Sequence, residues 1–341
     1  MARPTGPVSD ISSSLGEFER IDRIFAPLSA GAPGAFGLTD DAALLPDPPE
    51  GQAWTVTVDA LVAGVHFLPD DPPDLIARKA LRCNLSDLSA MGAVPAGYTL
   101  ALALPRGMDG AVAWIERFAK GLGQDQSEFG VHLFGGDSVS TTGPLWASIT
   151  AFGTVPGDRP LRRSTAKPGD DLWVSGTLGD AALGLLVLRG QILRDDVTEA
   201  LVRRYHLPQP RVSLGPALVG TAHAALDISD GLVQDAGHIA RRSGVAVEIE
   251  APSLPLSKAM IACIDSDPDL LHHVLVGGDD YELLFTAAPE ARSAIKQIAE
   301  RLEIRLTRIG TIREGTTAGV RVLDRHGEAL GGLDRGGWTH A

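Results

Sequence analysis

The sequence predicts a mixed α/β fold arranged as two domains. At 341 residues, the chain is long enough to enclose two hydrophobic cores. Short apolar runs typical of buried strands alternate with segments of helical periodicity in both halves. A Pro- and Gly-rich turn at residues 156–160 separates the halves. We therefore expect a flexible tail over residues 1–14, one domain over 15–157 and a second over 158–341.

The clearest element of the first half is a long helix that begins at residues 70–73. Two aspartates supply its cap, and two prolines follow at positions that a first helical turn tolerates. We expect this helix to run to about Met91 and to end at Gly92. The other elements expected from apolar periodicity are helices over 17–28 and 108–122 and strands over 54–58, 98–104, 131–134 and 146–152.

The second half also mixes strands and helices, and a turn at residues 167–170 precedes its first strand. The expected strands cover 171–174, 225–228, 245–249 and 282–285, with others near Ile304, Val320 and Val322. The expected helices cover 180–188, 197–205, 214–223 and 231–243, with others near Ser257 and up to Arg301. A Gly-Gly-Asp sequence in both halves hints at a distant duplication, although one short motif is weak evidence.

The composition limits the partners and the compartment of the protein. A formal net charge of -13 and a pI near 5.1 argue against broad binding to nucleic acid or to an anionic membrane. No apolar run approaches the roughly 18 residues of a membrane span, and the first residues lack the pattern of a signal peptide. Cys83 and Cys263 lie far apart, which suggests neither a disulfide framework nor a zinc ribbon. We expect a cytoplasmic protein.

Six short acidic motifs follow apolar runs along the chain. They lie at residues 39–41, 58–59, 84–87, 135–137, 227–231 and 277–282. Carboxylates beside a core are costly unless a cation neutralises them, and few basic residues stand next to these motifs in the sequence. Mg²⁺ takes oxygen ligands and usually retains waters and substrate phosphates. The motifs therefore indicate a Mg²⁺ cluster that holds a polyphosphate.

Each motif, taken alone, also has an ordinary structural explanation. Asp87 lies in the long helix, where three basic residues are the only other charged side chains over 76–91, so we expect it to be buried and to need a cation. Asp59 ends a predicted strand, which is a functional position in α/β proteins or simply a turn. Asp40 and Asp41 repel each other unless a cation lies between them or both face water.

Two later motifs combine acids with groups that suit phosphate. The glycines before Asp137 would let a phosphate approach the backbone, or they form a simple turn. Ser229 and Asp230 lie between a predicted strand and a helix, and they either cap that helix or bind metal and phosphate. The adjacent Arg162 and Arg163 could bind phosphate or form an exposed basic pair.

Several familiar nucleotide-binding signatures are missing from the sequence. It contains no lysine-armed phosphate loop, no kinase-type glycine loop and no dinucleotide fingerprint. A nucleotide would therefore be held through metals. His66 is a lone histidine, a type that is more often structural than catalytic, and Cys83 has the pattern of a small core residue.

The ordered set of motifs resembles the thiamine-monophosphate kinase family, from about residue 16 to residue 338. The most specific pieces are residues 16–18, 59–67, 79–93, 135–137, 163–164, 167–170, 227–232 and 278–283. That family belongs to a superfamily with aminoimidazole ribonucleotide synthetase and selenophosphate synthetase. The resemblance implies an α/β (α+β) fold like that of aminoimidazole ribonucleotide synthetase. Its N-terminal domain would pair with a second copy in a homodimer, and its C-terminal domain would be a layered α+β structure.

The resemblance also implies roles for individual residues. The Mg²⁺ ligands would be Asp41, Thr57, Asp59, Asp87, Asp137, Asp227 and Asp230. ATP would contact Gly136, Asp137, Arg163 and Ser229, and thiamine monophosphate would lie near His66, Asp279 and Trp338. The chain departs from the family's frequent residues at four of the motif positions, which are Thr39, Val58, Asp279 and Trp338.

The activity implied by the resemblance is ATP-dependent phosphorylation of thiamine monophosphate to thiamine diphosphate, by direct in-line transfer in a site with several Mg²⁺ ions. The acceptor phosphate is already anionic, so positioning and charge neutralisation would suffice without a strong general base. Selenophosphate synthetase activity would need a reactive Cys near residues 31–37, and none is present. A protein that binds ATP or a thiamine phosphate without turnover is the alternative.

Overall fold

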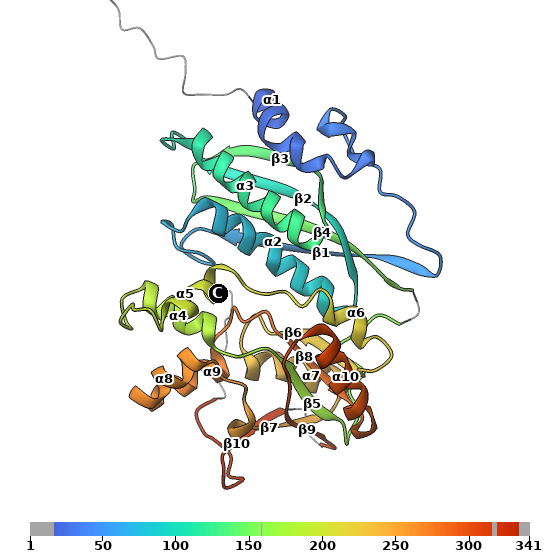
Figure 1. Ribbon diagram of the computed structural model, residues 1–341, viewed down its shortest axis with the longest axis vertical. Coiled ribbons are helices and arrows are strands. Elements are labelled where there is room, and N and C mark those ends of the chain that lie inside the picture. The colour runs from blue at the N-terminus through green and yellow to red at the C-terminus, as the bar shows by residue number, and fades with distance from the viewer. Residues whose placement is uncertain (1–16, 158, 316–318, 334–341) are drawn as a thin grey trace, which may run out of the picture.

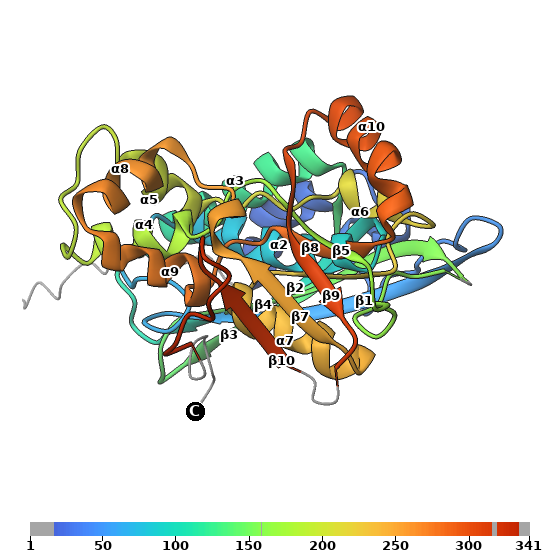
Figure 2. The same cartoon turned by 90° about the horizontal axis from the view of Figure 1, so that it is seen from below.

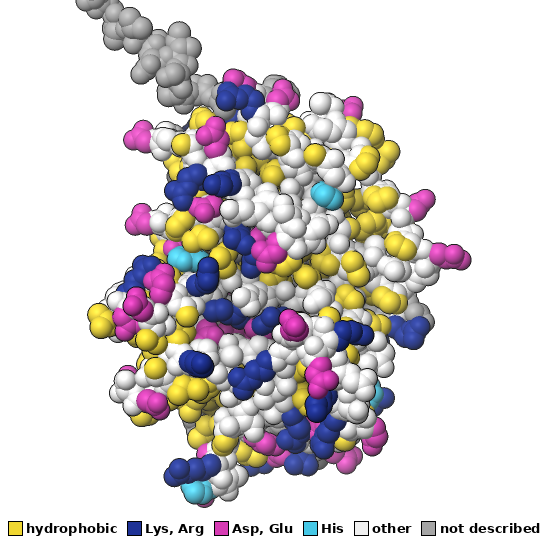
Figure 3. All heavy atoms as spheres, in the orientation of Figure 1, with side chains coloured by type: hydrophobic (Ala, Val, Ile, Leu, Met, Phe, Trp, Pro, Cys, Tyr) yellow, Lys and Arg dark blue, Asp and Glu magenta, His cyan; other side chains and the backbone are white. Residues whose placement is uncertain are grey.

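The computed structural model describes residues 17–157, 159–315 and 319–333. Two layered units follow one another along the chain and lie one above the other in Figure 1. On the face drawn in Figure 3, Lys and Arg side chains are interspersed with Asp and Glu side chains over both units. None of the described helices is long and apolar enough to cross a membrane. The tail expected over 1–14 and the candidate residue Trp338 lie outside the described residues.

The N-terminal unit is a four-stranded sheet with two long helices on one face (Figure 1). Its strands are β1 (Gln52–Val62), β2 (Val94–Pro105), β3 (His132–Thr141) and β4 (Trp146–Pro156), in the spatial order β1, β4, β2, β3. β2 and β3 are parallel, and the other neighbours are antiparallel. The helices are α2 (Pro73–Ala90) and α3 (Ala111–Phe129). The long helix and all four strands of this unit were predicted.

Alternation along the strands decides which side chains this sheet buries. Ala147, Ile149 and Ala151 of β4 belong to the core formed with the helices and are 0% exposed, since successive side chains of a strand point to opposite faces. On the opposite face, Val56 and Val58 of β1 are 61% and 60% exposed. We call this second side the open face.

Residues 17–28 are helical, as predicted, but they do not form one regular α-helix. α1 (Glu17–Arg20) passes into a π-helical turn at Ile21–Phe25 and then into a 3-10 turn at Ala26–Ser29. Pro27, which has no amide hydrogen to continue an α-helix, lies in the 3-10 turn. Another 3-10 segment, Pro33–Leu38, follows before the chain enters β1.

The C-terminal unit is built on a six-stranded sheet in the order β10, β7, β9, β5, β8, β6. The strands are β5 (Asp171–Ser175), β6 (Ala224–Asp227), β7 (Ala246–Glu250), β8 (Leu283–Ala287), β9 (Leu306–Arg313) and β10 (Gly319–Leu323). β7 and β10 are parallel, and the remaining neighbours are antiparallel. The sheet twists across the centre of Figure 2.

Helices cover both faces of this second sheet (Figure 2). They are α4 (Asp180–Leu188), α5 (Glu199–His206), α6 (Leu214–Leu218), α7 (Leu232–Ser243), α8 (Lys258–Ser266), α9 (Leu271–Val276) and α10 (Arg292–Leu302). Leu218 of α6 and Ile295 of α10 pack with Phe285 of β8 in one core. Ile239 of α7 packs with Leu284 of β8 in another.

Three local predictions need correction. Asp59 does not end a strand, because it lies inside β1 opposite Ile149 of β4. The Gly-Gly-Asp motif at 135–137 does not follow a strand, because β3 continues through it beside β2. The helix expected over 214–223 ends at Leu218. The apolar run before the last acidic motif, for which no element was predicted, forms α9. In the first two cases pairing with a neighbouring strand continues past residues that usually mark turns.

α2 joins the two units. Its Ser86 hydroxyl donates a hydrogen bond to Oδ2 of Asp227 at 2.8 Å, and Nη1 of Arg82 donates to the Pro208 carbonyl at 3.0 Å. Both partners lie in the C-terminal unit, so a single buried helix carries polar contacts into both halves of the molecule.

Candidate active site

A cavity of about 1000 Å³ lies where the two units meet. Residues of β1, α2 and α4 line it, together with the turns that join β6 to α7 and α9 to β8. The cavity gathers candidates that are far apart in the sequence, namely Asp59, His66, Asp87, Asp227, Ser229, Asp230 and Asp279. We call it the central cavity.

Hydroxyl groups orient two of the carboxylates in the central cavity. Thr57 Oγ1 donates to Oδ2 of Asp87 at 2.6 Å, and Ser86 Oγ donates to Oδ2 of Asp227 at 2.8 Å. Thr57 and Asp59 lie on the same face of β1, since alternate residues of a strand share a face. The acids of β1, α2 and β6 converge because β1 and α2 both face the end of β6, where Asp227 lies.

Burial and mutual repulsion raise the pKa values of these acids. The pKa of Asp59 rises to about 6, first because of burial and then because of the charges of Asp87 and Asp230. Burial raises the pKa of Asp87 as well. Asp227 is only 3% exposed, and burial followed by the charge of Asp87 raises its pKa well above the usual range. Within the described part of the chain, no Lys or Arg forms a salt bridge with Asp59, Asp87 or Asp227.

This donor set fits Mg²⁺. Carboxylate and hydroxyl oxygens are the ligands that a hard divalent cation takes. Acids that raise one another's pKa through their negative charges are stabilised by a cation between them. The residues placed to hold one are Thr57, Asp59, Asp87, Asp227 and Asp230.

Asp235 organises the turn between β6 and α7. Its Oδ2 accepts hydrogen bonds from the backbone N–H groups of Ser229, Asp230 and Gly231 at 3.1, 3.0 and 3.2 Å. Asp235 therefore accepts the free N–H groups at the start of α7, a capping role that the sequence suggested for Ser229 or Asp230. Ser229 and Asp230 both line the central cavity instead. No sequence signal distinguished Asp235 from an ordinary helical acid.

The turn between α9 and β8 holds Asp279 in a strained conformation. Asp279 and Tyr281 have φ values of 71° and 51°, a region that costs a residue with a side chain about 1–3 kcal/mol. Buried partners fix the turn around them. Both carboxylate oxygens of Asp280 accept the Gly179 N–H at 2.9 and 3.0 Å. The fully buried Glu282 accepts hydrogen bonds from Ser175, Arg204 and Arg211.

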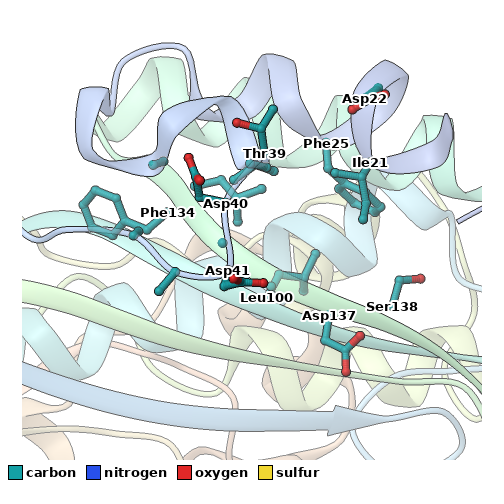
Figure 4. A pocket seen from close by; sticks show the side chains of 17 residues that line it. Ile21, Asp22, Phe25, Thr39, Asp40, Asp41, Leu100, Phe134, Asp137 and Ser138 are labelled. Atoms are coloured by element: carbon teal, nitrogen blue, oxygen red, sulfur yellow. The ribbon is translucent and has the colours of Figure 1, made fainter. Parts of the chain in front are cut away.

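Three candidates of the N-terminal unit line neither the central cavity nor a space next to it. Asp41, Gly136 and Asp137 line a second cavity of about 480 Å³ in the N-terminal unit. In Figure 4 the helical segment with Ile21 and Phe25 lies above the strands, and Asp41 and Asp137 lie at the level of the strands. Within one chain, the structure therefore separates these three from the Asp59 cluster.

Arg163 belongs to a third cavity, of about 410 Å³, that Thr57 and Asp87 also line. Arg162 and Arg242 stand there too. Asp87 borders both this cavity and the central one. Burial raises the pKa of Asp87, and the positive charge of Arg163 opposes that rise. The basic pair at 162–163 thus lies beside the carboxylates.

Lys79 and Tyr281 both line the central cavity, although neither was predicted from the sequence to be a site residue. The signal for Lys79 was a basic residue inside a mostly apolar helix, next to a motif already under consideration. Tyr281 lies within the last acidic motif, but nothing in its spacing indicated that its side chain turns into the cavity. Tertiary contacts across the two units place both residues.

Comparison with known proteins identifies homologues of this chain. The model of the AIR synthase related protein N-terminal domain matches residues 39–155, and that of the C-terminal domain matches 167–323. The thiamine-monophosphate kinase of Escherichia coli strain K12 is 41% identical over 332 residues, covering 96% of this chain and 98% of that protein.

Two solved structures agree with this assignment. Thiamine-monophosphate kinase from Stenotrophomonas maltophilia K279a is 45% identical, with a TM-score of 0.78, covering 86% of this chain and 91% of that one. AaThiL, complexed with AMPPCP and TMP, is 32% identical, with a TM-score of 0.76, covering 90% of this chain and 97% of that one. The two-domain fold expected from the motifs is confirmed. The chain belongs to the thiamine-monophosphate kinase family.

Proposed function

We propose that this protein uses ATP to phosphorylate thiamine monophosphate to thiamine diphosphate. The observation that carries the proposal is the central cavity, where a cluster of repelling carboxylates shares one space with His66 and Asp279. The binding of AMPPCP and TMP by AaThiL, a structural relative over 90% of this chain, supports the same pair of ligands here.

The carboxylates are the proposed Mg²⁺ ligands. The full set is Asp41, Thr57, Asp59, Asp87, Asp137, Asp227 and Asp230. Bound Mg²⁺ would neutralise the phosphate charge that repels an attacking anion. The hydrogen bonds from Thr57 and Ser86 hold the acids of α2 and β6 in place for this purpose.

Gly136, Asp137, Arg163 and Ser229 are the proposed contacts of ATP, and His66, Asp279 and Trp338 those of thiamine monophosphate. Arg163 lies beside Asp87, and a guanidinium group binds phosphate oxygens with two parallel hydrogen bonds. Ser229 and Asp279 line the same cavity, which supports binding of the two substrates side by side.

Phosphoryl transfer is proposed to be direct and in line. The phosphate oxygens of the acceptor are ionised near neutral pH, so no protein base has to remove a proton first. Cys83, which lies in the cavity wall, is 2% exposed, and burial raises the pKa of its thiol well above the usual value. A buried neutral thiol is a poor nucleophile, so this cysteine offers no route through a phosphorylated enzyme.

A homodimer is part of the proposal. Val56 and Val58 of β1 and Val139 of β3 are exposed on the N-terminal sheet. Exposed apolar side chains gathered on a sheet are typical of a protein–protein interface. A second copy of the chain, paired through the open face, would cover them.

Incubation of the purified chain with ATP, Mg²⁺ and thiamine monophosphate tests the proposal. We expect thiamine diphosphate and ADP in equal amounts, and loss of both products when a chelator removes Mg²⁺. Binding of both ligands without any thiamine diphosphate would favour the alternative, a sensor of ATP or thiamine phosphates. Absence of both binding and product would reject the two functions together.

A further inference from the structure

Lys79 is a buried lysine to which the proposed reaction assigns no role. Its side chain is only 3% exposed, and a charge at such a depth requires strong partners. Its ammonium group donates to Oδ2 of Asp279 at 2.8 Å and to the His66 carbonyl at 3.1 Å. The same group lies 3.8 Å from the centre of the Tyr205 ring. Two of its three hydrogens are thus donated to oxygen acceptors, and its positive charge also contacts the face of the Tyr205 ring.

The partners of Lys79 come from both units of the molecule. His66 follows β1 in the N-terminal unit, whereas Asp279 precedes β8 and Tyr205 belongs to α5 in the C-terminal unit. His66 and Asp279 are also the two described residues assigned to thiamine monophosphate. A single side chain of α2 therefore connects both sides of the acceptor site.

The orientation of the Asp279 carboxylate depends on this connection. Its backbone lies in the left-handed region, and its side chain is 31% exposed at the cavity. The Tyr281 hydroxyl donates to its other oxygen at 3.3 Å, which is longer than the charge-assisted bond from Lys79. Burial alone would lower the pKa of Lys79, but the charge of Asp279 and other neighbours outweigh it, so that pKa lies above its usual value. The ammonium group thus stays charged at neutral pH.

We propose that Lys79 is a positioning residue for the acceptor site: by holding the Asp279 carboxylate and the His66 carbonyl together, it sets the pocket for a phosphorylated, cationic ring compound. This inference rests on the proposed function, in which that compound is thiamine monophosphate. A carboxylate fixed at this place attracts the positive ring. Lys79 acts through these partners and not through a contact of its own with the substrate.

The test is a double-mutant cycle on Lys79 and Asp279, read as separate KM values. Lys79→Met keeps the length of the side chain and removes its charge. We expect the KM for thiamine monophosphate to rise about tenfold, while the KM for ATP stays within about twofold. Asp279→Asn should have the same selective effect. The double variant should be no worse than the poorer single variant, because both changes remove one shared contact.

A matched control separates positioning from general stability. Arg78 is the neighbouring residue on α2 and pairs with Asp125 and Glu128 of α3, within the N-terminal unit and away from the central cavity. Arg78→Met should lower the melting temperature and leave both KM values unchanged. If Lys79→Met does not fold, Lys79→Gln supplies the same comparison, since it keeps a donor for the His66 carbonyl without the charge.

Several outcomes would overturn the inference. They are unchanged KM values in Lys79→Met, an equal rise of the KM values for both substrates, and additive effects in the double variant, which would indicate direct contact with the substrate. Wild-type turnover is measured first, and its absence would refute the proposed function instead. In that case, equilibrium dialysis with thiamine monophosphate still decides, because equal affinity of wild type and Lys79→Met would overturn the positioning role.

Discussion

Asp59, Asp87 and Asp227 oppose the folding of the chain unless a cation neutralises them. Each is a carboxylate whose pKa is raised first by burial. Structural ion pairs usually compensate such burial, as Arg292 and Arg308 do for Asp171, whose pKa they lower. Asp59, Asp87 and Asp227 have no comparable salt bridge among the described residues. Carboxylates that are buried without a compensating positive charge indicate a binding site for a cation.

The first prediction concerns pH. The pKa of Asp59 is about 6 in the folded protein against a reference of 3.8. Between these values the folded form keeps a proton that the unfolded chain has lost, so the free energy of unfolding falls as the pH rises from about 4 to 6. Above about pH 6 the loss is complete, and Asp59 causes no further change with pH. The loss is on the order of 3 kcal/mol. Urea unfolding in chelator should show a smaller decline for Asp59→Asn than for wild type. Parallel declines would contradict the assignment.

The second prediction concerns Asp87. Asp87→Asn removes one charge from the proposed metal site while keeping the shape of the side chain, so kcat should fall by about 100-fold or more and a higher Mg²⁺ concentration should be needed. Asp74→Asn is the matched control, because Asp74 lies on the same helix and pairs with Arg117 at the surface. Steady-state kinetics at several Mg²⁺ concentrations provide the measurement. Near-normal turnover in Asp87→Asn would remove Asp87 from the metal site.

Among the secondary-structure elements, those with one clear periodicity were predictable and those that depend on pairing were not. α2 followed from its prolines and its apolar stripe, and the structure places it at Pro73–Ala90. The predicted aspartate cap was wrong, because Pro72 occupies the N-cap position, whereas the Asp71 carboxylate accepts a hydrogen bond from the Leu68 N–H and contacts His206. β1 and β3 run on through Asp59 and through the glycines at 135–136. Their extra length comes from hydrogen bonds to β4 and β2, which lie far away in the sequence. The residues next to a strand in the sequence do not show which distant strand will pair with it.

The third prediction tests why β3 carries glycine at position 136. A Cβ atom there would lie 2.1 Å from the carbonyl oxygen of Leu100 on β2, whereas a Cβ at Gly135 meets nothing within 4 Å. Gly136→Ala should therefore push the two strands apart and lower the free energy of unfolding by about 1–3 kcal/mol. Gly135→Ala, its direct neighbour, should have little effect. Denaturant unfolding of both variants without ligands gives the comparison, and equal stability of the two would contradict the close approach.

For the whole molecule, the sequence predicted two mixed α/β units but could not show how they meet. The contacts that build the central cavity join residues more than 100 positions apart, such as Ser86 with Asp227 and Lys79 with Asp279. The candidate acids could be named because each lies in a short motif. The sequence did not show which of these acids lie together in space. Asp41 and Asp137 belong by sequence to the same set and yet line a different cavity. Lys79 was not predicted to take part in the site, because its ion pair with Asp279 joins two segments that lie far apart in the sequence.

The fourth prediction addresses the proposed homodimer. Val58 is 60% exposed on the open face of the N-terminal sheet, and an aspartate in its place would bring a charge into an apolar interface without a partner, which is strongly unfavourable. Val58→Asp should therefore convert the dimer into a monomer, as measured by light scattering coupled to size exclusion. Leu193→Asp is the control, because Leu193 is 79% exposed but lies between α4 and α5 in the C-terminal unit. It should leave the dimer intact. A wild-type monomer, or a Val58→Asp dimer, would mean that the open face has another role.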